Sequence, residues 1–94
     1  MGAPRYRLRS ADVRIAPLSD LTLAFQRLSG ETHVLSPESA ALLDVIGTGT
    51  LSLDDMHAAL ARDYDFETAD KNEALTALGR LCESLEDVGL LERA

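Results

Sequence analysis

Histidine and cysteine are the side chains best suited to chemistry near neutral pH, and this chain of 94 residues carries only His33, His57 and Cys82. A catalytic centre needs a nucleophile or a base, together with a second group that orients it in a shielded pocket. Two histidines are the only bases that titrate near pH 7, so the sequence offers no such set. We therefore expect no catalytic residue, and we expect that the protein is not an enzyme.

Metal and phosphate binding have equally little support. Asp54 and His57 lie three residues apart in a predicted helix, which places them on one face. A structural metal site normally uses four ligands, so we favour a capping aspartate beside an exposed histidine. Gly47 and Gly49 are not followed by the lysine and hydroxyl residue of a phosphate-binding loop. We expect no metal and no cofactor.

Cys82 is the only cysteine, which excludes a disulfide within the chain. The acidic residues that follow it disfavour the reactive thiolate form, namely Glu83, Glu86 and Asp87. A buried and inert thiol is the expected state.

The distribution of charge argues against nucleic acid as a partner. The formal net charge is −7; residues 1–27 hold five arginines and two aspartates, a net +3, so the remainder carries −10. Binding to phosphate backbones depends on clustered Lys and Arg, and no such cluster follows Arg27. The sequence also lacks a secretory signal and any apolar run of about 18 residues that would span a membrane. The expected location is the cytoplasm.

The first third of the chain has the period of β-strands. Large apolar residues occupy every second position from Leu21 to Gln26, and Thr32 to Leu35 has the composition of a returning strand. The segment Leu28-Ser29-Gly30-Glu31 between them supplies the small residues and the glycine that a hairpin connection needs. Residues 5–8 and 13–15 are predicted to add one or two short strands upstream.

Three helices are predicted after the hairpin. Ser36 caps the first, which runs from Pro37 to Ile46 and ends at Gly47. Ser52 with Asp54 and Asp55 caps the second, which ends near Asp63. A turn over residues 64–67 directs Tyr64 and Phe66 into the core, and Thr68 caps a third helix that extends to about Val88.

Gly89 fits the end of the third helix, and Leu90 to Glu92 forms one last short strand in this prediction. The fold class is α+β and winged-helix-like: an N-terminal antiparallel β-hairpin or three-stranded sheet, three helices and a short C-terminal wing. No linker or repeat divides the chain, so residues 1–94 are predicted to form a single domain.

Four stretches of this sequence resemble the PqqD-like family, also known as the RiPP recognition element type, and in particular its subgroup associated with an HPr-kinase-related protein. These stretches are Ser29 to Pro37 (SGETHVLSP), Ala40 to Ile46, Leu51 to Asp54 (LSLD) and Leu85 to Glu92 (LEDVGLLE). The similarity extends over about residues 13–92.

The resemblance implies a non-enzymatic adaptor that binds a substrate or leader peptide and presents it to a partner modifying enzyme, of the radical SAM or HPr-kinase-related class. In such domains the peptide adds as an extra strand beside the third strand and lies in a groove formed with the third helix. Here these elements would be Glu31 to Leu35 and Lys71 to Glu86. An edge strand suits this role because its unpaired backbone groups bind an extended peptide irrespective of sequence.

The predicted peptide-binding residues come from these two elements: Glu31, Thr32, His33, Val34, Leu35, Lys71, Leu75, Leu78, Gly79 and Cys82. Gly79 is notable because glycine inside a helix costs about 0.5–1 kcal/mol relative to alanine, a cost that close approach of a peptide would offset. The alternative for Gly79 is tight packing inside the protein. The same alternative applies to Leu75, Leu78 and Cys82, which would then be core residues.

Two other functions share this architecture. A DNA-binding winged-helix regulator would need a basic reading helix, whereas the third helix here is acidic. A structural homodimer could arise by exchange of the N-terminal strand between chains. The sequence leaves open whether the chain is a monomer or a homodimer.

Overall fold

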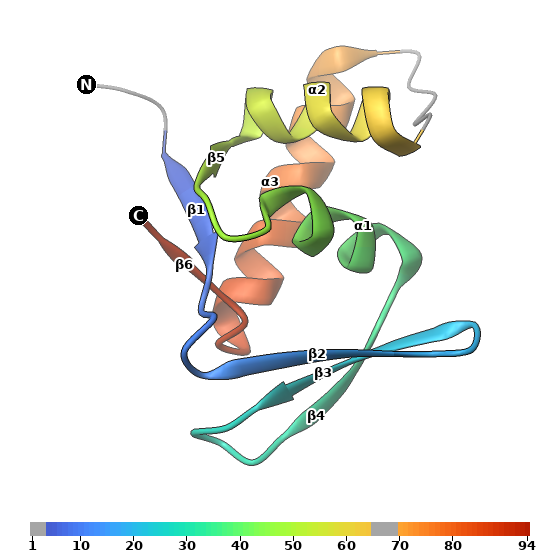
Figure 1. The fold of residues 1–94 in the computed structure, drawn as a ribbon. Helices are drawn as coiled ribbons and strands as arrows, with labels where there is room; N and C mark the ends of the chain where they lie inside the picture. Colours follow the sequence, from blue (N-terminus) through green and yellow to red (C-terminus); the bar gives the residue numbers. More distant parts are fainter. Residues whose placement is uncertain (1–3, 65–69) are drawn as a thin grey trace.

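A computed structural model of the chain describes residues 4–64 and 70–94, and in these it has an α+β architecture (Figure 1). The elements in order are β1 (Arg5–Leu8), β2 (Val13–Leu18), β3 (Leu21–Gln26), β4 (Thr32–Leu35), α1 (Pro37–Ile46), β5 (Leu51–Ser52), α2 (Leu53–Tyr64), α3 (Lys71–Asp87) and β6 (Leu91–Arg93). The predicted α+β class is confirmed. No helix among the described residues is both long and apolar enough to cross a membrane.

The strands form two antiparallel sheets of three strands each, in the orders β2-β3-β4 and β5-β1-β6. The predicted hairpin is β3 and β4, and β2 completes its sheet by pairing with β3 along its whole length, from Val13 opposite Gln26 to Leu18 opposite Leu21. The first strand does not join this sheet. It lies between β5 and β6, so the two ends of the chain meet in one sheet beside the helices.

Capping side chains explain where the first two helices begin. The hydroxyl of Ser36 accepts a hydrogen bond from the amide of Ser39 at 3.1 Å, with Pro37 in the first helical position. At α2, the Ser52 hydroxyl accepts from the Asp55 amide at 3.2 Å while the Asp55 carboxylate accepts from the Ser52 amide at 3.4 Å. Both predicted caps are therefore confirmed.

The third helix begins later than the sequence suggested. Its cap is Asp70, whose carboxylate accepts from the amide of Asn72 at 2.9 Å, and the helix starts at Lys71. Thr68, Phe66 and the rest of the turn predicted there lie outside the described residues, as does the side chain of Tyr64. The far end is as predicted: Gly89 has a φ of +79°, and the amide of Leu90 donates to the carbonyl of Leu85 at 2.9 Å.

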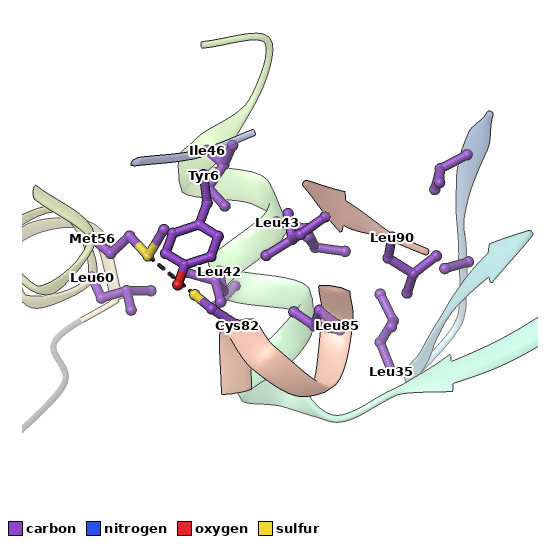
Figure 2. Close-up of a cluster of buried hydrophobic side chains, with 14 residues drawn as sticks. Tyr6, Leu35, Leu42, Leu43, Ile46, Met56, Leu60, Cys82, Leu85 and Leu90 are labelled. Carbon is purple, nitrogen blue, oxygen red and sulfur yellow. Dashed lines mark hydrogen bonds between the residues drawn. The ribbon is translucent and has the colours of Figure 1, made fainter. Parts of the chain in front are cut away.

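The core lies between the three helices and the inner face of the β2-β3-β4 sheet. It is aliphatic, with Leu42, Met56, Leu90, Leu91 and Cys82 as its largest fully buried side chains. Figure 2 shows Tyr6 of β1 reaching toward Met56 and Cys82, whose thiol donates a hydrogen bond to the Met56 sulfur at 3.6 Å. The N-terminal strand is thus anchored in the core by one aromatic ring.

A buried glutamine joins the β2-β3-β4 sheet to the helices. Gln26, only 4% exposed, donates from its Nε2 to the carbonyl of Gly89 at 2.8 Å, and its Oε1 accepts from the amide of Leu28 at 2.6 Å. The side chain therefore links the end of β3 to the turn between α3 and β6. Figure 1 shows the β2-β3-β4 sheet lying beneath the helices, and the Gln26 hydrogen bonds join the two parts.

Candidate functional site

Strand β4 forms one edge of the β2-β3-β4 sheet. It pairs with β3 from Thr22 opposite Leu35 to Phe25 opposite Thr32, and no other described strand pairs with it. The strand is four residues long and sits between the Gly30 turn and the start of α1. Of the predicted strand residues, Thr32 to Leu35 lie in β4, and Glu31 precedes it.

The hydrogen-bond pattern identifies the backbone groups that this edge offers. The Gln26 amide donates to the Glu31 carbonyl at 2.9 Å, and in antiparallel pairs the bonded positions alternate. His33 and Leu35 therefore direct their backbone groups toward β3. The N–H and C=O groups of Thr32 and Val34 face the open edge, where they can bind an added strand.

The opposite edge of the same sheet is less suited to strand addition. The Arg27 amide donates to the Asp12 carbonyl at 2.7 Å, so by the same alternation Val13, Ile15 and Pro17 face the outer edge of β2. Proline has no N–H to donate, and its ring obstructs a neighbouring strand. An added strand is therefore better accommodated beside β4 than beside β2.

An apolar pocket of about 290 Å³ lies where β4 passes into α1. It is lined by Ser36, Glu38, His57, Leu60, Ala74, Ala77, Leu78 and Leu81, which come from the start of α1, from α2 and from one face of α3. The volume falls just below the ~300–1,000 Å³ range of pockets for drug-sized ligands. The pocket therefore suits one or two apolar side chains better than a cofactor.

The predicted α3 residues do not all reach this pocket. Leu78 lines it. Gly79 faces α2 instead, because a Cβ atom built on it would lie 3.6 Å from Cδ1 of Leu53. Cys82 is fully buried against Met56, and Lys71 lies on the surface in an ion pair with Asp54 at 3.4 Å.

Leu75 is half-buried on α3 and does not line the pocket. Ala74, Ala77 and Leu81 do line it. The prediction did not include them, and for the two alanines the reason is that alanine carries a weak hydrophobic signal. Residues 74, 77, 78 and 81 are three or four positions apart along the helix, so they form a second apolar stripe. This stripe lies next to the stripe of larger residues that enters the core. That spacing was the available signal.

Two titratable side chains near the site have distinctive surroundings. The Nε2 atom of His33 is buried without a hydrogen-bond partner among the described residues, although its strand is at the sheet edge. A buried polar atom without a partner costs free energy that a new hydrogen bond would recover. For Cys82, burial and, secondarily, the charge of Glu86 raise the pKa to about 11, so the thiol is protonated and unreactive near neutral pH.

A larger and more open trough of about 680 Å³ lies between α1 and the β2–β3 strands, with Ile15, Pro17, Thr22, Ala40 and Leu43 among its lining residues. It is next to the proline-bearing edge rather than the β4 edge. Neither hollow is a metal centre: no group of three or more His, Cys, Asp or Glu side chains within residues 4–64 and 70–94 is placed to hold an ion. The β4 edge offers backbone hydrogen bonds, and its pocket offers apolar contacts.

Comparisons of this chain with models of known protein families, with curated proteins and with solved structures find no match.

Proposed function

We propose that this chain is a non-enzymatic peptide-binding adaptor of the PqqD-like type, which presents a peptide or protein substrate to a partner modifying enzyme. The observation that carries the proposal is the open edge of β4, with the backbone groups of Thr32 and Val34 facing outward next to an apolar pocket. In this proposal an extended peptide adds as a fourth strand beside β4.

The two parts of the site have different roles in this proposal. Main-chain hydrogen bonds to Thr32 and Val34 provide affinity that is independent of sequence, and the pocket selects an apolar side chain of the peptide. Leu78 and Leu81 contact that side chain, while Glu38 lies at the same pocket. Because the chain carries a net charge of −7, basic residues flanking the apolar anchor favour binding.

We also propose that the domain is a winged helix. The elements α1, β5, α2, α3 and β6 follow one another in the order of a winged helix, and β1 supplies the middle strand of the small sheet. A winged helix that reads DNA uses a basic recognition helix. Helix α3 instead carries Glu73, Glu83, Glu86 and Asp87, which supports a peptide rather than a nucleic acid as the partner.

The test is a titration with peptides encoded by the genes that flank this one, measured by fluorescence anisotropy. The variant Thr32→Pro removes an N–H that faces the open edge and places a ring there, but it leaves the ladder to β3 intact. We expect at least tenfold weaker binding, since one hydrogen bond of ~0.5–1.5 kcal/mol is lost and the ring obstructs the guest.

The matched control is Thr32→Ala, which removes the same side chain and retains the N–H. We expect it to bind within about twofold of the wild type. Equal affinities for the two variants would show that the β4 edge is not where the peptide binds, and the proposal would then be wrong.

A further inference from the structure

The outer face of the β2-β3-β4 sheet is apolar and uncovered. Alternation along the strands places Ala16, Leu18, Leu21, Leu23, Phe25 and Val34 on the face that points away from the helices. The exposed fractions are 55% for Leu18, 53% for Leu21, 36% for Phe25 and 64% for Val34. No segment within residues 4–64 and 70–94 covers these side chains.

The size of this face matches the apolar part of a protein interface. The four exposed side chains together present on the order of 400 Å² of apolar surface, within the ~300–600 Å² of the largest patches on monomeric proteins. A standard interface buries ~800 Å² on each partner, of which a little over half is apolar. The face therefore supplies about the apolar area that one stable interface requires.

Charge favours a second copy of the same sheet as the occupant. Within residues 13–35 two arginines, Arg14 and Arg27, balance Asp20 and Glu31, so the sheet is neutral while the whole chain carries −7. Two copies that met through their helices would bring acidic surfaces together. Contact through the sheets places the neutral parts in contact and keeps the acidic parts apart.

The positions on the sheet are also self-complementary. The outer face has three rows across the strands: Arg14 and Phe25 with Thr32, then Ala16 and Leu23 with Val34, then Leu18 with Leu21. Two copies can face each other through these sheets about a two-fold axis. The axis lies in the plane between the sheets, runs perpendicular to the strands and passes over the middle row. It places the first row of one copy opposite the third row of the other. Phe25 then packs against the Leu21 of the second copy.

The same operation brings Arg14 of one copy to the end of the sheet where Asp20 of the other lies, in the turn that follows Leu18. Both side chains are exposed, and neither forms an ion pair within the described part of the chain. We propose that this protein forms a two-fold symmetric homodimer through the outer faces of its β2-β3-β4 sheets, with Phe25 on Leu21 and Arg14 beside Asp20 across the axis. The proposal does not rest on peptide binding, because β4 contributes only the side chains of Thr32 and Val34 to this face, whereas the peptide site uses their backbone groups at the open edge and the pocket beside α1.

Sedimentation equilibrium from micromolar to millimolar concentration tests the proposal. The wild type is expected to reach the mass of two 10.2 kDa chains, and Leu21→Lys is expected to weaken association at least tenfold because it buries two charges per dimer. The matched control is Val88→Lys, which changes another exposed apolar residue, 38% exposed at the end of α3. It should associate like the wild type.

The charge pair gives a second and more specific readout. Arg14→Asp should weaken the dimer through repulsion with Asp20, and the double change Arg14→Asp with Asp20→Arg should restore association to within about threefold of the wild type. Far-UV circular dichroism checks that each variant is folded. A monomer at every concentration, equal effects of Leu21→Lys and Val88→Lys, or no recovery in the double variant would each overturn this interface.

Discussion

Replacing Gly89 by alanine should destabilise the protein far more than the same change at Gly30, although the two glycines share a left-handed backbone. Their φ angles are +79° and +75°. An alanine at either position adopts a conformation that costs about 1–2 kcal/mol. The difference lies in what the new methyl group meets: nothing within 4 Å at Gly30, but the Nε2 atom of Gln26 at 2.8 Å at Gly89.

The end of the Gln26 side chain can move away from that methyl group, but only by losing its hydrogen bonds to the Gly89 carbonyl and the Leu28 amide. Each is worth about 0.5–1.5 kcal/mol. Gly89→Ala is therefore expected to cost about 2–5 kcal/mol, against about 1–2 kcal/mol for Gly30→Ala. In thermal unfolding, 1 kcal/mol corresponds to about 4–8 °C for a domain of this size.

The assay is urea unfolding followed by circular dichroism on Gly89→Ala, Gly30→Ala, Gln26→Ala and the double variant Gln26→Ala with Gly89→Ala. With Gln26 truncated, the alanine at position 89 meets no amide group, so its cost should fall to that of Gly30→Ala. Equal midpoints for the two glycine variants, or strictly additive free energies in the double variant, would refute the role assigned to Gln26.

Three further predictions concern α3, the thiol and DNA. Gly79→Ala should raise the stability by about 0.5–1 kcal/mol, because its Cβ makes an ordinary 3.6 Å contact with Leu53; a loss of stability in thermal unfolding would contradict this packing. Folding raises the pKa of Cys82 from 9.0 to about 11, so the stability that this thiol contributes is intact below pH 9 and is lost as the pH rises through 11. The decline should be shallower in Cys82→Ala than in the wild type. Mobility-shift assays with mixed DNA duplexes at low salt should show no complex, and a salt-sensitive shift would favour the regulator alternative instead.

The sequence predicted most of the secondary structure because local chemistry determined it. Serine caps, a proline in the first helical turn and glycines after the last turn fix the ends of α1 and the start of α2 within a residue. The start of α3 was misplaced because Thr68 and Asp70 are both good caps, and composition alone does not choose between them. The pairing of β1 with β5 and β6 is non-local, and no pattern within residues 5–8 indicates its partners.

The strand that carries part of the candidate site was easier to locate from the sequence than the pocket-lining face of α3. The strand Thr32 to Leu35 was predicted from its composition and from the turn residues before it, whereas its role as a peptide-binding edge came from the resemblance to the PqqD-like family. On α3, periodicity marks two adjacent apolar stripes but does not reveal which one enters the core. Cys82 is fully buried in the core and Leu78 lines the pocket, a difference that depends on tertiary packing rather than on the period of the helix.

Amide hydrogen exchange measured residue by residue tests the open edge of β4 most directly. In the protein alone, the amides of His33 and Leu35 should be protected by their bonds to β3, while those of Thr32 and Val34 exchange at rates near those of unstructured peptides. Addition of a peptide that binds should slow exchange at Thr32 and Val34. Protection of these two amides in the protein alone, or their rapid exchange in the presence of saturating peptide, would contradict strand addition at this edge.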